Sequence, residues 1–266
     1  MSGNHSNEWR LPLESELVDA LRAGQLTMAY QPMFDIVDGR LVGLEALSRW
    51  THSTLGAVPP AEFVAVAERS GLIFRFTRWS LQQACEELAA WRWESPGAAG
   101  IPVSVNISTE CLLEPGFADI VEECTTSSGL APSDIVVEVA AHTVGRGQVI
   151  ENLRGLAERR IPITLDGFDR SSGTAEQLGR MPLSSVKIGV DVLRAAGSDP
   201  EAAELIRSVA TVGARQGFTT VAKGVETRDE LEAARGAGCS QAQGNLLGQA
   251  IPESRFADLL HAGWAI

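Results

Sequence analysis

G-L-E-A-L-S-R-W, residues 43–50, is the stretch of sequence around which the chain is organised. If it forms a β-strand, alternate side chains share a face, so Glu45, Leu47 and Arg49 point the same way. A glutamate inside an apolar strand is uncommon and needs an explanation. Two explanations remain open: a structural salt bridge at the strand end, or a site where Glu45 holds a metal ion and Arg49 holds a phosphate.

The composition predicts one domain away from membranes and nucleic acid. A length of 266 residues with 44% hydrophobic content suits a single α/β barrel, which needs about 250 residues. The net charge of −12, with no run of Lys or Arg, argues against a general nucleic-acid binder. The N-terminus is polar, no segment approaches membrane-spanning length, and the four cysteines form no C-x-x-C pair. We expect a cytoplasmic protein with reduced thiols, a flexible lead at residues 1–10 and one domain over residues 11–266.

Hydrophobic periodicity predicts an antiparallel strand pair followed by strands that alternate with helices. A helix is expected at 13–21, and a strand at 26–31 that stops at Pro32 and turns at Asp38-Gly39 into the organising strand. Residues 51–60 are expected to form a loop before helices at 61–70 and 77–93. The later strands are expected at 103–107, 135–139, 162–165, 185–188, 219–222 and 242–246, and the helices that follow them at 116–128, 148–160, 174–180, 200–216, 228–237 and 252–260. Such alternation predicts an α/β fold, a modified TIM-like (βα)8 barrel with its first strand antiparallel.

Polar side chains lie at or just past the ends of the predicted strands. In a barrel of this kind the carboxyl ends of the parallel strands meet at one opening, so residues far apart in sequence become neighbours. A single such residue is usually a cap, but a series of them favours a functional site. The residues in question are Glu45, Asn106, Glu138, Asp166, Lys187, Lys223, Glu226 and Gln243.

Seven motifs in order make the chain similar to the EAL domains that hydrolyse the second messenger cyclic di-GMP, from residue 11 to residue 260. They are Y-Q-P at 30–32, E-A-L-S-R-W at 45–50, G-A-V-P-P-A-E-F at 56–63, A-E-R-S-G-L-I at 67–73, V-N-I-S at 105–108, V-K-I at 186–188 and G-V-E-T at 224–227. For active members, the resemblance implies two Mg²⁺ or Mn²⁺ ions that activate a water to open the cyclic dinucleotide to linear pGpG.

The resemblance also assigns roles to residues of this sequence. It implies metal ligands at Glu45, Asn106, Glu138 and Asp166. It implies that Lys187 orients the attacking water, which makes Glu45 and Lys187 the catalytic pair. It implies a nucleotide pocket formed by Gln31, Glu45, Leu47, Arg49, Asn106, Lys223, Glu226 and Gln243.

Four acidic residues of the family pattern are absent from this sequence. Ala141, Gly167, Gly189 and Lys223 stand in their places. The loss of four acids and the gain of one lysine shifts the opening by five charge units towards positive. An ammonium group repels a nearby divalent ion, so we expect no metal or weakly bound Mg²⁺ or Mn²⁺, and little hydrolysis.

Three functions remain open from the sequence. The first is a receptor that binds cyclic di-GMP without cutting it, which we favour. The second is an active phosphodiesterase with one metal and Lys187 as base, and the third is a protein-interaction module that no longer binds nucleotide. Lys223 could replace the missing metal or form a structural ion pair, and these two roles are equally weighted. We expect a protein partner, while the altered loop at 166–171 leaves a homodimer open.

Overall fold

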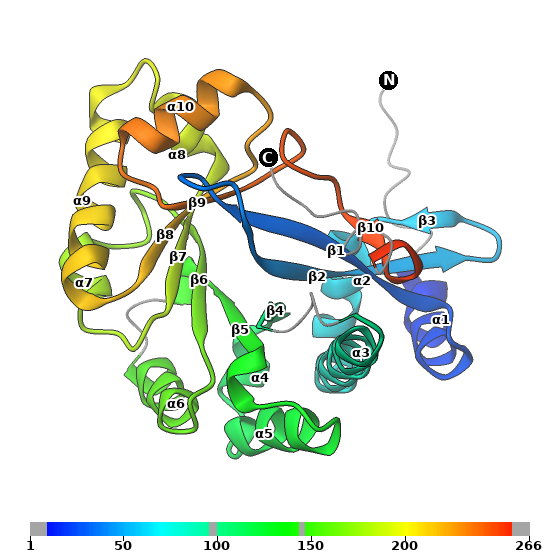
Figure 1. The fold of residues 1–266 in the computed structure, drawn as a ribbon. Helices are drawn as coiled ribbons and strands as arrows, with labels where there is room; N and C mark the ends of the chain where they lie inside the picture. Colours follow the sequence, from blue (N-terminus) through cyan, green and yellow to red (C-terminus); the bar gives the residue numbers. More distant parts are fainter. Residues whose placement is uncertain (1–9, 96–99, 144–146, 257–266) are drawn as a thin grey trace.

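The computed structural model describes residues 10–95, 100–143 and 147–256 of the chain. Eight of its strands close into a barrel with helices around the outside (Figure 1), which confirms the predicted fold class. The barrel strands are β1 (Leu26–Asp35), β2 (Leu41–His52), β4 (Val103–Ile107), β5 (Ile135–Ala140), β6 (Ile163–Phe168), β7 (Ser185–Ile188), β8 (Thr219–Lys223) and β9 (Gln241–Gln243). Two short strands, β3 (Gly56–Val58) and β10 (Ile251–Pro252), extend the sheet at its ends.

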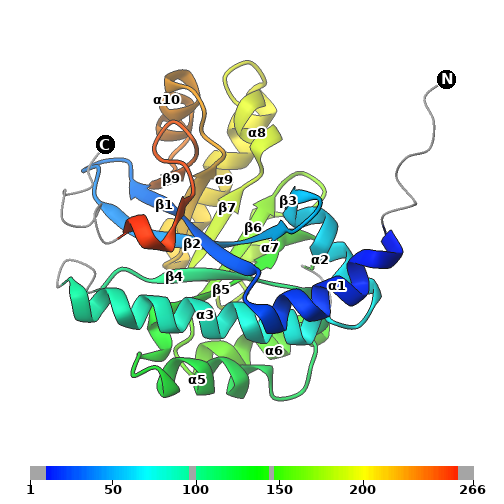
Figure 2. The same cartoon turned by 90° about the vertical axis from the view of Figure 1, so that its right-hand side faces the viewer.

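Helices fill most of the connections between the strands. The long helix α3 runs along the outside of the first strands, as the turned view shows (Figure 2). The helices are α1 (Arg10–Ala23), α2 (Pro60–Arg69), α3 (Ile73–Glu94), α4 (Thr109–Leu112), α5 (Phe117–Ser127), α6 (Gly147–Glu158), α7 (Ala175–Leu178), α8 (Val190–Ala195), α9 (Pro200–Gln216) and α10 (Arg228–Gly236). Short 3-10 turns occur at η2 (Pro132–Asp134), η3 (Ala141–Thr143) and η4 (Glu253–Arg255).

Strand β1 runs antiparallel to both of its barrel neighbours, β2 and β9, while the other barrel pairs are parallel. The expectation that Pro32 stops this strand is wrong, because β1 continues to Asp35. Leu44, opposite Pro32, donates its N–H to Pro102 instead. On the other side of β1, the β10 pairs end at Tyr30 and the β9 pairs begin at Met33. Pro32 therefore lies where no ladder bond requires its missing N–H.

Several short elements of the structure differ from the sequence-based expectations. The expected loop at 51–60 contains the end of β2 and all of β3, which form a hairpin in which Trp50 lies opposite Val58. The ring nitrogen Nδ1 of His52 accepts hydrogen bonds from the N–H groups of Thr54 and Leu55 and shapes the turn. Helices α4 and α8 were likewise not expected. At the end of the chain, residues 251–255 form β10 and η4 instead of the start of the helix expected at 252–260, and residues 257–260 lie outside the described residues. Of the flexible lead expected at residues 1–10, residue 10 is the first residue of α1, and residues 1–9 lie outside the described residues.

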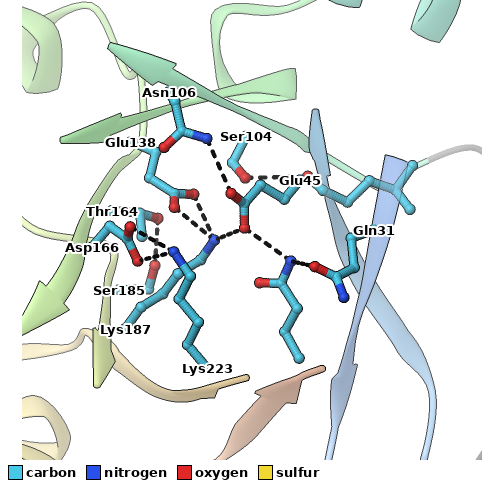
Figure 3. Close-up of polar contacts among 12 residues, drawn as sticks. Gln31, Glu45, Ser104, Asn106, Glu138, Thr164, Asp166, Ser185, Lys187 and Lys223 are labelled. Atoms are coloured by element: carbon cyan, nitrogen blue, oxygen red, sulfur yellow. Dashed lines mark hydrogen bonds and ion pairs between the residues drawn. The ribbon is translucent and has the colours of Figure 1, made fainter. Parts of the chain in front are cut away.

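The apolar core lies between the strands and the helices. In β7, for example, Val186 and Ile188 are fully buried on the helix-facing side, whereas Ser185 and Lys187 alternate with them and point into the barrel (Figure 3). The helix-facing layer carries the hydrophobic stabilisation, and the barrel interior holds polar groups. No helix in the described part of the chain is both long enough and apolar enough to cross a membrane.

Candidate functional site

Each of the eight barrel strands contributes one polar side chain to a cluster at the carboxyl end of the parallel strands, which we call the mouth (Figure 3). Strand pairing fixes the placement, since Gln31 lies opposite Glu45, Asn106 opposite Glu138, and Lys223 opposite Gln243. The members of the cluster, from β1 to β9, are Gln31, Glu45, Asn106, Glu138, Asp166, Lys187, Lys223 and Gln243.

Lys187 is the centre of the cluster. Its Nζ lies 2.6 Å from Oε2 of Glu45, and 2.8 and 2.7 Å from the two carboxylate oxygens of Glu138. All three side chains are buried, with Lys187 and Glu138 at 0% side-chain exposure. Because a buried charge is costly without partners, the ammonium stabilises both carboxylates, and removal of Lys187 leaves two unpaired carboxylates in the interior.

A second ion pair lies nearer the solvent. Nζ of Lys223 is 2.8 and 2.7 Å from the two carboxylate oxygens of Asp166. Their side chains are 31% and 20% exposed, so this outer pair faces the mouth while Lys187 is enclosed. Lys223 therefore forms an ion pair with Asp166.

Amide groups complete the cluster. Nδ2 of Asn106 donates to Oε1 of Glu45 at 3.0 Å, and Nε2 of Gln243 donates to Oε2 of Glu45 at 2.9 Å and to Oε1 of Gln31 at 3.2 Å. Nε2 of Gln31 in turn donates to the carbonyl oxygen of Gly248 at 3.2 Å. Oε1 of Gln243 is buried and has no hydrogen-bond partner among the described residues. Glu45 is thus held from three strands besides its own.

These contacts separate the pKa values of the two inner carboxyl groups. Burial alone would raise the pKa of Glu45, but the ammonium groups of Lys187 and Lys223 lower it well below its usual range. For Glu138, burial and the neighbouring Glu45 raise the pKa, against the lowering effect of Lys187. The nearby carboxylates raise the pKa of Lys187 and that of Lys223, although burial alone would lower both. Both lysines are therefore charged at neutral pH and act as fixed cations.

The donor set at the mouth does not fit a divalent ion. Magnesium and manganese require several free oxygen ligands. Every carboxylate oxygen of Glu45, Glu138 and Asp166 already accepts a hydrogen bond, five of the six from an ammonium group. No group of three or more His, Cys, Asp or Glu side chains in the described part of the chain could hold a metal. A divalent ion would have to displace Lys223 from Asp166 before it found a ligand.

At three positions a glycine or an alanine replaces a family acid, and the local constraints differ among the three. Gly167 has φ of +76°, a left-handed conformation, with open space where a Cβ would lie. Gly189, the residue before α8, would bring a Cβ into ordinary contact with the carbonyl oxygen of Phe168 at 3.4 Å. Ala141 is buried in η3. Aspartate tolerates the left-handed region better than most residues, so Gly167 can accept it at modest cost, and Gly189 has an ordinary φ of −60°.

Leu47 and Arg49 lie apart from the charged cluster. They line a cavity of about 530 Å³ at the same end of the barrel, between β2, β4 and helices α2 and α3, and Asn106 joins this cavity to the cluster. Nη1 of Arg49 donates to the carbonyl oxygen of Ser48 at 3.0 Å, and partial burial lowers its pKa. Glu226 is outside both groups, since its half-exposed carboxylate pairs with Arg194 at 3.1 Å.

A layer of hydroxyl groups that was not expected from the sequence lies beneath the cluster (Figure 3). Thr164 and Ser185 share a hydrogen bond of 2.6 Å, and Ser104 donates to the carbonyl oxygen of Leu44 at 3.3 Å. Each of the three lies two residues before a cluster member on its own strand, so strand alternation could have identified them. Small polar side chains here leave room for the stem of Lys187.

Comparisons with known proteins identify the family of this chain. A family model described as the EAL domain matches residues 14–250. An uncharacterized protein of Mycobacterium tuberculosis, Rv1357c, is 31% identical over 92% of this chain and 82% of its own length. The bifunctional diguanylate cyclase/cyclic di-GMP phosphodiesterase MucR of Pseudomonas aeruginosa is 30% identical over 96% of this chain, which spans only 37% of MucR.

Solved structures give the same result. The PaMucR phosphodiesterase in its c-di-GMP complex superposes with a TM-score of 0.85 at 30% identity, covering 92% of this chain and 99% of that chain. The FimX EAL domain of Pseudomonas aeruginosa bound to c-di-GMP has a TM-score of 0.79 over 90% of this chain and 96% of that chain. Its identity of 21% supports a shared fold and nothing further.

Proposed function

Because this chain belongs to the EAL domain family, we propose that it is a receptor that binds cyclic di-GMP at the barrel mouth in second-messenger signalling and does not hydrolyse it efficiently. The observation that carries the proposal is the contact of Lys223 with both carboxylate oxygens of Asp166. An ammonium group occupies the place where a hydrolytic site needs free carboxylates. The names of MucR and PaMucR, a phosphodiesterase seen with c-di-GMP, support the ligand.

The mouth has the groups that an anionic dinucleotide requires. Arg49 borders the cavity of about 530 Å³, a size typical of small-molecule sites, and a guanidinium donates two parallel hydrogen bonds to a phosphate. Lys223, at the end of β8, adds a second cation at the mouth. Apolar walls from Leu47, Ile73 and Phe76 suit the flat face of a base. These residues bind and orient the ligand, but none of them generates a hydroxide.

Isothermal titration with cyclic di-GMP in EDTA tests the proposal. We expect binding without divalent ions, weakened at least about tenfold by Arg49→Ala because a charge-assisted bidentate contact is lost. Arg207→Ala is a matched control, since Arg207 is half-exposed on α9 and pairs with Glu204 at 3.0 Å. No binding by the wild-type protein would favour the nucleotide-independent interaction module.

An active phosphodiesterase is the second candidate, because Glu45, Asn106, Glu138 and Lys187 converge from four strands. Incubation of purified protein with cyclic di-GMP and manganese, with chromatography for pGpG, separates the two functions. The receptor proposal expects no steady product. Accumulation of pGpG that disappears in Glu45→Ala would establish hydrolysis instead.

A further inference from the structure

The outer ion pair of the cluster suggests a distinct role for Asp166. Building on the receptor function proposed above, we infer that Asp166 is an internal competitor of the anionic ligand. The Asp166 carboxylate is bound to the Lys223 ammonium in this structure. A phosphate of the ligand must displace this carboxylate to bind the same ammonium. Asp166 therefore lowers the affinity for the ligand. A residue that contacted the ligand directly, or that only stabilised the fold, would raise this affinity.

The contacts of the pair fit such an exchange. Both carboxylate oxygens of Asp166 accept from the same Nζ of Lys223, at 2.8 and 2.7 Å. A phosphate offers the same arrangement of acceptor oxygens, so the two anions compete for one cation. The pair is 31% and 20% exposed, whereas Lys187 is fully enclosed by Glu45 and Glu138. Of the two cluster ammonium groups, Lys223 is the one that an incoming ligand reaches.

The charge balance points the same way. Three carboxylates and two ammonium groups give the cluster a formal net charge of −1. A cyclic dinucleotide carries two phosphodiester charges, so the cluster as a whole repels it. Neutralising Asp166 brings the cluster to zero and leaves Lys223 unpaired. Both changes favour an anion at the mouth.

The position of Lys223 does not depend on Asp166. The next residue, Gly224, has φ of +74° and packs so closely on Val190 that a Cβ would lie 2.7 Å from its Cγ2. Val225 then donates its N–H to the carbonyl oxygen of Gln243 at 3.0 Å. The backbone that carries Lys223 is therefore held by β9 and α8. Replacement of Asp166 therefore changes the partner of the Lys223 ammonium and leaves the Lys223 backbone in place.

The experiment is a titration of cyclic di-GMP in EDTA at low salt against the wild-type protein and Asp166→Asn. We expect the variant to bind more tightly than the wild type, by up to about tenfold. The ligand no longer has to break a partly exposed ion pair before it reaches Lys223. Asp166→Ala should do the same. Lys223→Met should bind more weakly than wild type, and Asp166→Asn combined with Lys223→Met should bind no more tightly than Lys223→Met alone. Glu204→Gln is the matched control: it removes one charge from an exposed pair on α9 and should not change affinity.

The outcomes separate this inference from the receptor function. If neither the wild-type protein nor Asp166→Asn binds, the receptor function fails and the inference falls with it. Thermal unfolding first establishes that both Asp166 variants are folded. If the wild type binds cyclic di-GMP and both variants bind it equally well or more weakly, the inference alone is overturned. A gain that persists in the double variant also overturns it, because the effect would then bypass Lys223.

Discussion

Replacement of Lys187 by methionine is the sharpest test of the buried cluster. Methionine is of similar length and removes only the charge and its hydrogen bonds. In the wild-type protein, the Lys187 ammonium lies within 2.8 Å of the carboxylates of Glu45 and Glu138, which are 4% and 0% exposed. The variant leaves these two carboxylates facing each other without a cation between them.

The expected loss of stability follows from this geometry. Removal of one partner from a buried ion pair costs about 3–5 kcal/mol, and here two carboxylates lose the same partner. We therefore expect a decrease of about 4 kcal/mol in the free energy of unfolding at pH 8, or about 8–16 °C in Tm. The variant's carboxyl groups have raised pKa values when folded, so they bind protons and the loss shrinks as the pH falls towards 5.

Urea unfolding at pH 8 and pH 5 measures both effects. A variant that also carries Glu45→Gln and Glu138→Gln is the control, because neutral side chains of the same shape remove the unpaired charges and should recover most of the stability. A loss below about 1 kcal/mol at pH 8, or a loss that does not depend on pH, would refute the view that Lys187 neutralises the two carboxylates.

Three further perturbations follow from the structure. Restoring three of the four missing family acids together should raise manganese affinity in isothermal titration; the changes are Gly167→Asp, Gly189→Asp and Lys223→Glu. Burial raises the pKa of Glu87 to about 7, so the folded state keeps a proton that the unfolded state releases, and stability falls as the pH rises from about 4.5 to 7. Glu87→Gln should therefore be more stable than wild type at pH 8, by about 1 kcal/mol after solvent screening, and equal to it at pH 4 in urea unfolding. Gly244→Ala should cost about 3 kcal/mol or more in thermal unfolding, because its Cβ would lie 2.1 Å from the carbonyl oxygen of Val225.

For each of these three predictions, one result would contradict the structural reason given for it. No gain in manganese affinity would mean that the mouth differs from metal-binding relatives in shape as well as charge. Equal stability of Glu87→Gln and wild type at pH 8 would show that the Glu87 carboxyl titrates as an exposed group. Gly155→Ala, in α6 with no atom near the new Cβ, is the control for Gly244→Ala, and a similar loss in both would contradict the backbone clash.

Local sequence signals were enough to identify most of the regular elements. Helix α9 illustrates why: Asp199 caps its first turn, Pro200 occupies the first helical position, and Gly217 ends it with φ of +88°. Strand β1 was cut short at Pro32 because a proline is a local signal, whereas its tolerance depends on the distant partners β9 and β10. The hairpin of β2 and β3 was missed because a histidine side chain, rather than a turn dipeptide, shapes it.

The members of the charged cluster could be named from strand ends, but their pairing could not. In the structure, Lys187 lies between Glu45 and Glu138, and Lys223 lies beside Asp166. The sequence does not show which lysine contacts which carboxylate, because those contacts depend on barrel register and burial. The sequence also grouped Glu226 with the pocket, while the structure pairs it with Arg194. Residue roles in ligand binding stay predictions.

The antiparallel β1 has a consequence for biosynthesis. Its partners include β9 and β10, with Met33 opposite Gln243 and Tyr30 opposite Ile251, so the first strand of the barrel to leave the ribosome pairs with the last ones. Contacts of such long sequence separation slow folding. The nascent β1–β2 hairpin must therefore wait with an open edge until synthesis of the barrel is nearly complete, and chaperone dependence during translation is the expected outcome.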